Sequence, residues 1–243
     1  MKKIICVGLF VCMSTLTGCL ATAPVSQQTR IDEVPMYGGI DRMAIPELRA
    51  ADAKFISDVS AQFGSRENAA VTWVNRGFKL QQEGQLGMAM RRFNQAWLLN
   101  PKHPEVYAGF ASVLHDQGKN CEAMKMMDKA LELDPPKFQG IYPDAGRITT
   151  LCAVSDKSLS AEGKKQLFER SEKLYQLAES IEPNKRYVYA SWATAYYWRA
   201  QYADAWRMIA KERAAGGSPS EKFLGLLKAK MPEPENLGNL GSQ

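Results

Sequence analysis

The amino-acid sequence predicts an all-α protein, built as a short α-solenoid of about four helical hairpins. One further helix precedes the hairpins and a capping helix follows them. Two observations carry this prediction: a pattern of eight residues occurs twice with a spacing of 34 residues, and no segment shows the alternating polarity of a convincing β-strand. The chain has 243 residues, of which 45% are hydrophobic and 23% charged, so it is long enough to bury a sizeable core.

The repeated pattern has a simple steric meaning. Small residues stand where two antiparallel helices must approach each other, and large apolar residues fill the seam between them. Glycine stands at the turn between the helices, where a left-handed residue ends a helix, and proline stops the second helix. The first copy is Trp73, Gly77, Leu80, Gly84, Ala89, Phe93, Ala96 and Pro101, and the second is Tyr107, Ala111, Leu114, Gly118, Ala123, Met127, Ala130 and Pro135.

This spacing and residue pattern resemble the tetratricopeptide repeat. The resemblance implies that the hairpins stack, because one hairpin cannot bury its own apolar face. It also implies a concave groove, lined by the first helix of each hairpin, that binds an extended or helical peptide.

The rest of the domain is expected to follow the same plan with one irregularity. Pro183 follows Pro135 by 48 residues, which exceeds the repeat by 14, so the third hairpin should have a first helix at 143–154, an enlarged turn and a long second helix at 161–181. The whole helical domain should span residues 46–231. Its parts are an N-terminal helix at 46–63, hairpins at about 70–101, 104–135, 141–183 and 186–215, and a capping helix at 220–230.

The N-terminus resembles the export signal of a bacterial lipoprotein. Two lysines, an apolar run at 4–13 and the motif Leu-Thr-Gly-Cys at 16–19 follow one another, in the order of a signal peptide with a lipobox. The resemblance implies that residues 1–18 are cleaved and that Cys19 is acylated, which anchors the protein to a membrane. The alternative is an ordinary secretory signal, or an uncleaved anchor, with an incidental cysteine.

The residues after Cys19 predict where the protein is held. Leu20 stands where an Asp usually favours retention in the inner membrane, so the resemblance implies the inner leaflet of the outer membrane, facing the periplasm. Residues 19–45, rich in Pro, Gly and polar residues, should form a flexible tether, and residues 232–243 a disordered tail. Whether residues 35–63 dock onto the repeats and fill the groove stays open.

The cysteines are expected to differ in fate. Two leave with the signal peptide and Cys19 is acylated, so Cys121 and Cys152 remain in a compartment that permits disulfides. In hairpins that run up, down and up, both residues fall at the same end of the array. We therefore predict a disulfide between them; the alternative is two buried free thiols that pack as small hydrophobic side chains.

The sequence contains no convincing catalytic set. His103 lies in an expected turn between repeats, and His115 neighbours Asp116, which points elsewhere on a helix. Two histidines alone are too few ligands for a metal site. The net charge of +5, which falls to +3 without Lys2 and Lys3, is too mild for a nucleic-acid surface. We expect no enzyme activity, metal, cofactor, nucleic acid or small-molecule substrate.

The predicted groove faces away from the hairpin seams and combines aromatic anchors with a few polar groups, which suits a protein or peptide partner. The alternative is that these aromatic rings pack against the N-terminal segment or a neighbouring repeat. The groove residues are Asn75, Phe78, Gln82, Ser112, His115, Asp116, Tyr187, Tyr197 and Trp198.

These features predict a membrane-anchored periplasmic scaffold or adaptor that supports an envelope assembly or secretion system. In plan the chain resembles tetratricopeptide lipoproteins that serve as pilotins, pilus factors or adaptors of peptidoglycan hydrolases. The alternative function is a periplasmic immunity or inhibitor lipoprotein that neutralises a toxic effector. The repeat pattern encodes packing, so it does not select among partners.

Overall fold

The computed structural model describes residues 30–137 and 139–235. The predicted signal peptide at 1–18, the predicted lipid site Cys19 and residues 236–243 of the predicted tail lie outside these residues. Three short 3₁₀ turns precede the helices: η1 (Ile31–Glu33), η2 (Pro35–Gly39) and η3 (Arg42–Ala44). The helices are α1 (Pro46–Phe63), α2 (Arg66–Gln82), α3 (Leu86–Leu99), α4 (Pro104–Asp116), α5 (Asn120–Glu132), α6 (Ile141–Ser155), α7 (Ala161–Ile181), α8 (Lys185–Trp198), α9 (Tyr202–Ala214) and α10 (Glu221–Lys228).

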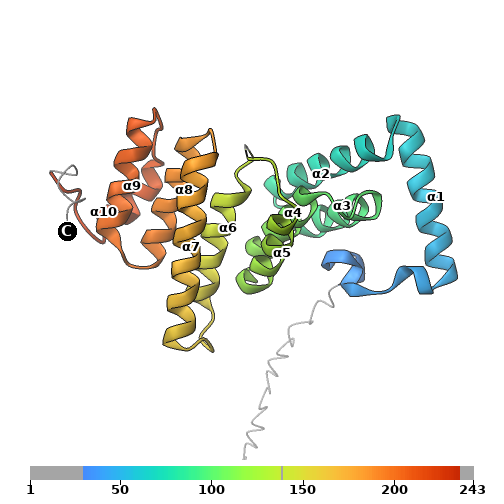
Figure 1. The fold of residues 1–243 in the computed structure, drawn as a ribbon, viewed down its shortest axis with the longest axis horizontal. Coiled ribbons are helices and arrows are strands. Elements are labelled where there is room, and N and C mark those ends of the chain that lie inside the picture. The colour runs from blue at the N-terminus through green and yellow to red at the C-terminus, as the bar shows by residue number, and fades with distance from the viewer. Residues whose placement is uncertain (1–29, 138, 236–243) are drawn as a thin grey trace, which may run out of the picture.

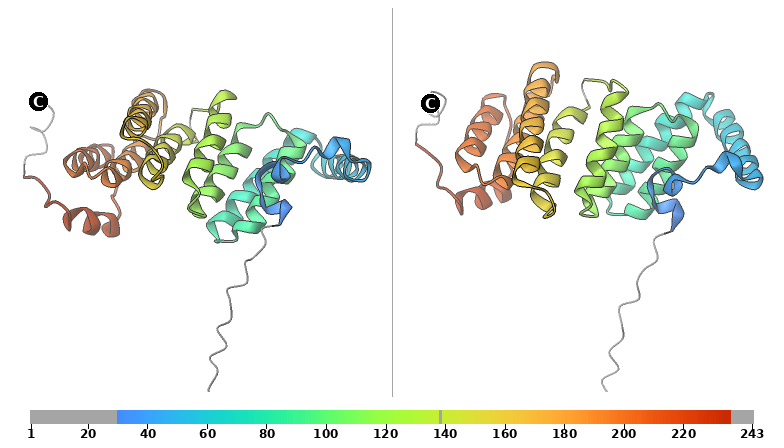
Figure 2. Two further views of the ribbon diagram at one scale, coloured as in Figure 1. Left: turned by 90° about the horizontal axis from the view of Figure 1, so that it is seen from below. Right: turned by 60° about the horizontal axis from the view of Figure 1, so that its bottom comes forward.

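The helices pair into four hairpins, α2–α3, α4–α5, α6–α7 and α8–α9, that stack in one row between α1 and α10 (Figures 1 and 2). The all-α solenoid prediction is confirmed, and no strand occurs in the part of the chain that the structure describes. Gly84 and Gly118 have the left-handed backbone expected at the turns, with φ of 74° and 77°. The first hairpin begins before the expected position 70, because the Ser65 hydroxyl caps α2 by accepting from the Asn68 N–H at 3.0 Å.

The seam of the first two hairpins is built around the ring of Phe93. Phe93 lies on α3 with none of its surface exposed. A Cβ added to Gly77 on α2 would lie 2.6 Å from this ring, and one added to Gly109 on α4 would lie 2.2 Å from it. Two helix backbones therefore flank one aromatic ring, and the ring sets the distance between hairpins.

The third hairpin repeats this arrangement with different residues. Tyr175 on the long helix α7 is fully buried, and a Cβ on Gly146 of α6 would lie 2.9 Å from its ring. The Tyr175 hydroxyl donates to the Ser191 carbonyl at 3.0 Å, and its ring stacks on Trp192 of α8 at 5.1 Å. An aromatic residue of a second helix thus joins α6 to α8, as Phe93 joins α2 to α4.

The N-terminal segment, residues 31–45, differs from the sequence prediction. It was expected to belong to a flexible tether, but η1 and η2 pack on α3, and η3 packs on α1. The buried Asn94 amide donates to the carbonyls of Asp32 and Val34, at 3.0 and 2.8 Å, and its oxygen accepts from the Tyr37 N–H at 3.2 Å. Arg91 forms ion pairs with Asp32, at 3.1 Å, and with Glu33. The flexible-tether prediction is wrong for these residues, because α3 supplies partners for their backbone.

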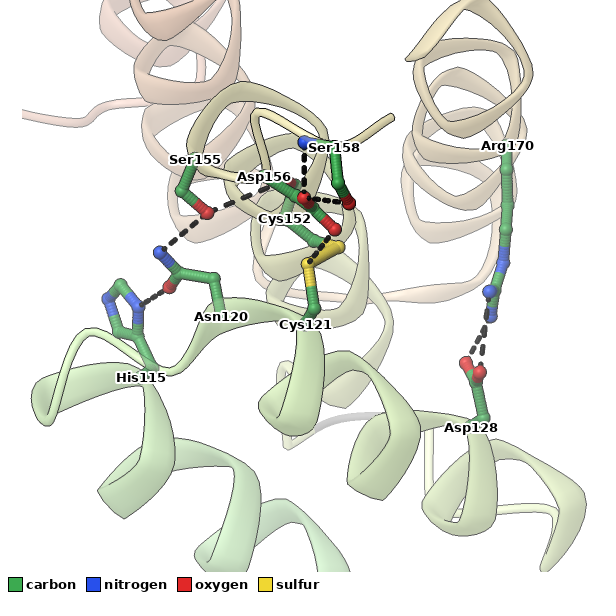
Figure 3. Close-up of a disulfide and its surroundings, with 9 residues drawn as sticks. All are labelled: His115, Asn120, Cys121, Asp128, Cys152, Ser155, Asp156, Ser158 and Arg170. Carbon is green, nitrogen blue, oxygen red and sulfur yellow. Dashed lines mark hydrogen bonds and ion pairs between the residues drawn. A yellow bond between two sulfur atoms is a disulfide. The ribbon is translucent and has the colours of Figure 1, made fainter. Parts of the chain in front are cut away.

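The second and third hairpins are fastened at both ends of α5. Cys121 near the start of α5 and Cys152 near the end of α6 lie with their Cα atoms 4.6 Å and their sulfur atoms 2.05 Å apart, so the structure joins the predicted pair as a disulfide (Figure 3). Further along α5, Asp128 forms an ion pair with Arg170 of α7 (Figure 3). These two links hold the irregular third hairpin to the regular second one.

We predict that Gly109→Ala lowers the free energy of unfolding by about 1–3 kcal/mol, because the new methyl group overlaps the Phe93 ring between two backbones. Gly225→Ala on α10 is the matched control, since a Cβ there meets nothing within 4 Å. The control should leave stability unchanged or raise it by up to about 1 kcal/mol. Denaturant titration measures both, and equal effects would contradict the proposed role of Phe93.

We predict that the mature chain carrying Cys19→Ser has no reactive thiol when denatured without reductant and two after reduction. Replacing Cys121 and Cys152 by alanine should lower the free energy of unfolding by about 3–4 kcal/mol, the value that a loop-closure model gives for such a spacing. A thiol assay and denaturant titration measure these outcomes. Two reactive thiols before reduction would show that the bond is absent.

Candidate partner-binding groove

A cleft of about 280 Å³ opens between the first helices α2, α4 and α6. Its floor is apolar, with a polar rim at the α6 side. Phe78 on α2 forms one wall and is itself fixed, because its ring packs edge-on against Phe93 with ring centres 5.0 Å apart. The residues that line the cleft are Phe78, Glu105, Ala108, Ser112, Met127, Gln139, Ile141, Asp144, Arg147 and Ile148.

A chain of polar contacts runs along the rim of the cleft. The Tyr187 hydroxyl donates to Asp144 at 2.6 Å, and the Arg147 guanidinium donates to the same carboxylate oxygen at 3.0 Å. Arg147 also donates to Nε2 of His115 at 3.0 Å. These contacts tie α8, α6 and α4 together at the rim.

The charge of this rim is held in place. Burial by itself lowers the pKa of Arg147, but the adjacent carboxylate of Asp144 outweighs it and raises the pKa above its usual value. Burial and the charge of Asp144 both raise the pKa of Tyr187, so its hydroxyl keeps its proton and remains a donor. The rim therefore presents a charged guanidinium and a protonated hydroxyl, both bound to the side chain of Asp144.

His115 is engaged at both ring nitrogens. A guanidinium only donates, so Nε2 of His115 accepts from Arg147. Nδ1 then carries the proton and donates to the Asn120 side-chain oxygen at 2.8 Å, and the Asn120 amide donates to Ser155 at 3.5 Å (Figure 3). His115 thus acts as a link between helices, with neither nitrogen left to take a proton from a substrate.

Glu105 marks the opposite edge of the cleft. Its carboxylate accepts a hydrogen bond from the side chain of Gln139, at the start of the third hairpin. Because Asp144 is neutralised by Arg147, Glu105 leaves the cleft lining with one net negative charge. The lining thus combines an apolar floor with one negative charge at its edge.

The nine predicted groove residues separate into four groups, of which three lie at or beside the cleft. Phe78 and Ser112 line the cleft, and His115 and Tyr187 belong to the polar chain at its rim. Three others stand on the open surface beside it: Asn75 and Gln82 are exposed on α2, and Asp116 is exposed and accepts from Gln81. Residues 31–63 do not line the cleft, so the N-terminal segment leaves it open.

Tyr197 and Trp198 lie elsewhere, which corrects this part of the predicted groove. The ring of Tyr197 packs against Tyr202 of α9, at 5.8 Å, and Phe223 of α10, at 5.7 Å. Helix α10 folds back over this end of the array, so Tyr197 belongs to the C-terminal core. Trp198 stands edge-on to Tyr197 at the end of α8 and is 51% exposed.

The sequence analysis missed the residues that α6 and its preceding loop contribute. Gln139, Asp144, Arg147 and Ile148 all belong to the third hairpin, where the repeat register is interrupted. Glu105 was missed because it stands in the first turn of α4, where an acidic residue also suits the helix dipole. The one usable signal was the spacing of Asp144 and Arg147, which is that of a helical ion pair.

Comparison with known families agrees with this geometry. Residues 80–140, which span the last turn of α2, the helices α3 to α5 and the following loop, match the tetratricopeptide repeat. These residues of the chain therefore carry tetratricopeptide repeats. Searches of the curated proteins and of the solved structures gave no match. Tetratricopeptide repeats indicate a scaffold for protein–protein interaction and are typically not catalytic.

Two further findings concern the part of the chain that the structure describes. In residues 30–137 and 139–235, no three His, Cys, Asp or Glu side chains gather as a metal ion needs. Over the same ranges, no helix combines the length and apolar character that a bilayer crossing requires. The cleft between α2, α4 and α6 is therefore described by its apolar floor and its ion pair alone.

We predict that Asp144→Asn lowers the free energy of unfolding of this protein by about 1–3 kcal/mol, because Arg147 loses the charge that compensates its burial. Asp204→Asn is the matched control: Asp204 also forms an ion pair three residues along, with Arg207, in the first turn of a helix. The control should change stability by at most about 0.5 kcal/mol. Similar losses in both variants would show that the contacts to His115 and Tyr187 add nothing.

Proposed function

We propose that this protein is a lipid-anchored scaffold in the periplasm that binds a protein or peptide partner in the cleft between α2, α4 and α6. The anchor is acylated Cys19, in the inner leaflet of the outer membrane, and the partner belongs to an envelope assembly or secretion system. The observation that carries the proposal is an open cleft, on the first helices of tetratricopeptide repeats, whose walls are fixed by their own contacts.

The chemistry of the cleft suits one apolar side chain of a partner with polar groups beside it. Phe78, Ala108 and Ile148 give an apolar surface, while the rim offers a guanidinium and carboxylates to backbone or side-chain groups. Because Phe78 and Arg147 are already held by Phe93, His115 and Asp144, binding orders few new side chains. A cleft whose side chains are already held in place favours binding of a partner over catalysis of a reaction.

The N-terminal segment supports an anchored position close to the membrane. Arg30, where the described chain begins, is eleven positions after Cys19. A fully extended chain of that length reaches at most about 40 Å. The fold on α3 therefore shortens the predicted tether and keeps Arg30 within that distance of the proposed anchor.

The proposed role is binding without catalysis. The nitrogens of His115 are both engaged, and its neighbours Arg147 and Asp144 neutralise each other. His103 lies at the start of α4, outside the residues that line the cleft. The repeats thus supply a surface, and the partner supplies any chemistry.

We predict that a photo-crosslinking residue at Gln82, beside the cleft, captures a specific partner in native cells, and that Ser112→Arg abolishes this capture by filling the cleft. Ser57→Arg on the exposed face of α1 is the matched control and should leave capture unchanged. Crosslinking at Ser57 should not give the same product. Capture that is insensitive to Ser112→Arg would place the partner elsewhere and contradict the proposed groove.

The anchor is tested in the same cells. Cys19→Ser should move the protein from the outer-membrane fraction to the soluble periplasm, while Ser57→Arg should not. Because acylation contributes about 0.8 kcal/mol for each buried methylene, loss of several chains should release the protein completely. Retention of Cys19→Ser in the membrane fraction would contradict the lipid assignment, whatever the groove binds.

A further inference from the structure

Helix α7 of the third hairpin is the structural equivalent of α3 of the first. Phe93 corresponds to Tyr175 and Ala96 to Ala178, each 82 positions further along the chain, and all four are fully buried. The same offset relates Arg91 and Asn94 on α3 to Lys173 and Gln176 on α7. Both second helices therefore carry a cation and, three residues later, an amide.

On α3 this pair of side chains binds an extended stretch of protein. Asn94 bonds three backbone groups of residues 32–37, and Arg91 pairs with the acidic side chains of Asp32 and Glu33. The helix thus recognises two features of the segment. The amide of Asn94 forms hydrogen bonds with its backbone, and the guanidinium of Arg91 pairs with its carboxylates. The N-terminal segment thus shows what this position of a second helix can hold.

On α5 the equivalent position is already used inside the fold. There Asp128 stands in place of the amide and forms an ion pair with Arg170 of α7 (Figure 3). Helix α7 therefore occupies the position on α5 that the N-terminal segment occupies on α3. Lys125 corresponds to Arg91 and Lys173, and it is exposed. The third hairpin therefore leaves no room for an added segment at this position of the second hairpin.

On α7 the equivalent position lies in an open cleft of about 700 Å³. Lys173 and Gln176 are exposed there, whereas Asn94 is buried under the N-terminal segment. The far wall is formed by the end of α8 and the start of α9. The lining carries the cations Lys165, Lys173 and Arg199, the carboxylates Glu169, Glu172 and Asp204, and the side chains of Phe168, Gln176, Tyr196 and Gln201. The three carboxylates are paired with Lys165, Arg199 and Arg207, respectively, which leaves Lys173 as the cation without an ion pair among the described residues.

The far wall is ready to receive an acidic group. The guanidinium of Arg199 lies over the rings of Phe168, at 4.8 Å, and Tyr196, at 5.3 Å, and it makes one long contact to Glu172, at 3.4 Å. Glu172 also accepts from the Tyr196 hydroxyl, at 2.9 Å. Arg199 thus has donor positions left, and Lys173 stands across the cleft from it.

We propose that this α7 cleft binds an extended segment of a partner protein that carries an acidic side chain. Gln176 pairs with the backbone of the segment, as Asn94 does with the N-terminal segment, and Lys173 pairs with the acid. The partly exposed ring of Phe168 packs against its apolar residues. This site is separate from the groove between α2, α4 and α6, so the scaffold has two places for extended chains.

One difference between α3 and α7 determines how many acidic side chains the α7 cleft can bind. Glu169 stands where α3 has Gly87, the residue that lies against Glu33. Lys165 neutralises Glu169 only across 4.0 Å on an exposed surface. The α7 cleft therefore suits one acidic residue beside Lys173, rather than the pair that α3 binds, and removing Glu169 should strengthen binding.

The test uses the mature chain with Cys19→Ser and a fluorescent peptide with the sequence of residues 30–37. The α3 site stays occupied, because the attached N-terminal segment has a high effective concentration. We expect saturable binding that Lys173→Glu weakens by about tenfold and Glu169→Ala strengthens by about threefold. Lys125→Glu, the matched control on α5, should leave the affinity unchanged.

Three outcomes would overturn the proposal. One is equal affinity for the wild-type chain and Lys173→Glu. Another is equal affinity for the peptide in which Asp32→Asn and Glu33→Gln remove both negative charges. The third is no saturable binding to either the wild-type chain or Glu169→Ala. Circular dichroism of each variant checks that its helices remain, so a loss of binding reports the site and not the fold.

Discussion

The ring of Phe93 is the contact on which the array depends. It lies between the backbones of α2 and α4, where Gly77 and Gly109 leave room for it and for nothing larger. Because a helix backbone does not yield as a side chain does, the ring fixes how far apart the two hairpins stand. Tyr175 plays this part again between α6 and α8, with Gly146 on one side and Trp192 on the other. The distance between stacked hairpins is therefore set by aromatic residues of the second helices, α3 and α7.

The partner cleft follows from that spacing. Phe78 packs on Phe93 and for this reason presents a fixed edge to the cleft, and the distance between α4 and α6 lets Arg147 reach His115. The polar chain from Tyr187 to Asn120 crosses several helices, so it holds only if the hairpins keep their relative positions. Packing in the seam and polar contacts at the rim thus stabilise the same arrangement from two sides.

Sequence analysis could predict the part of this fold that repeats. Small, aromatic and turn residues recur because each hairpin meets the same steric demand, and the helix bounds of α1 and α7 follow from local signals such as Ser160 before α7. The fold of the N-terminal segment could not be predicted from a repeated pattern. Asn94 is an ordinary polar residue in the sequence, and its partners lie about 60 residues away. Arg147 escaped because the enlarged third hairpin removes the register that would align it.

The placement of the N-terminal segment decides how the proposed anchor and the proposed binding site relate. The segment lies on α3, a second helix, while the partner cleft is lined mainly by first helices. A chain held through residues 31–45 therefore does not compete with a partner in the cleft, which a segment folded along α2 and α4 would do. The cation and amide that hold it recur on α7 without an occupant from within the described chain. The same helix position thus holds the N-terminal segment on α3, contacts the next hairpin on α5, and lies in an open cleft on α7.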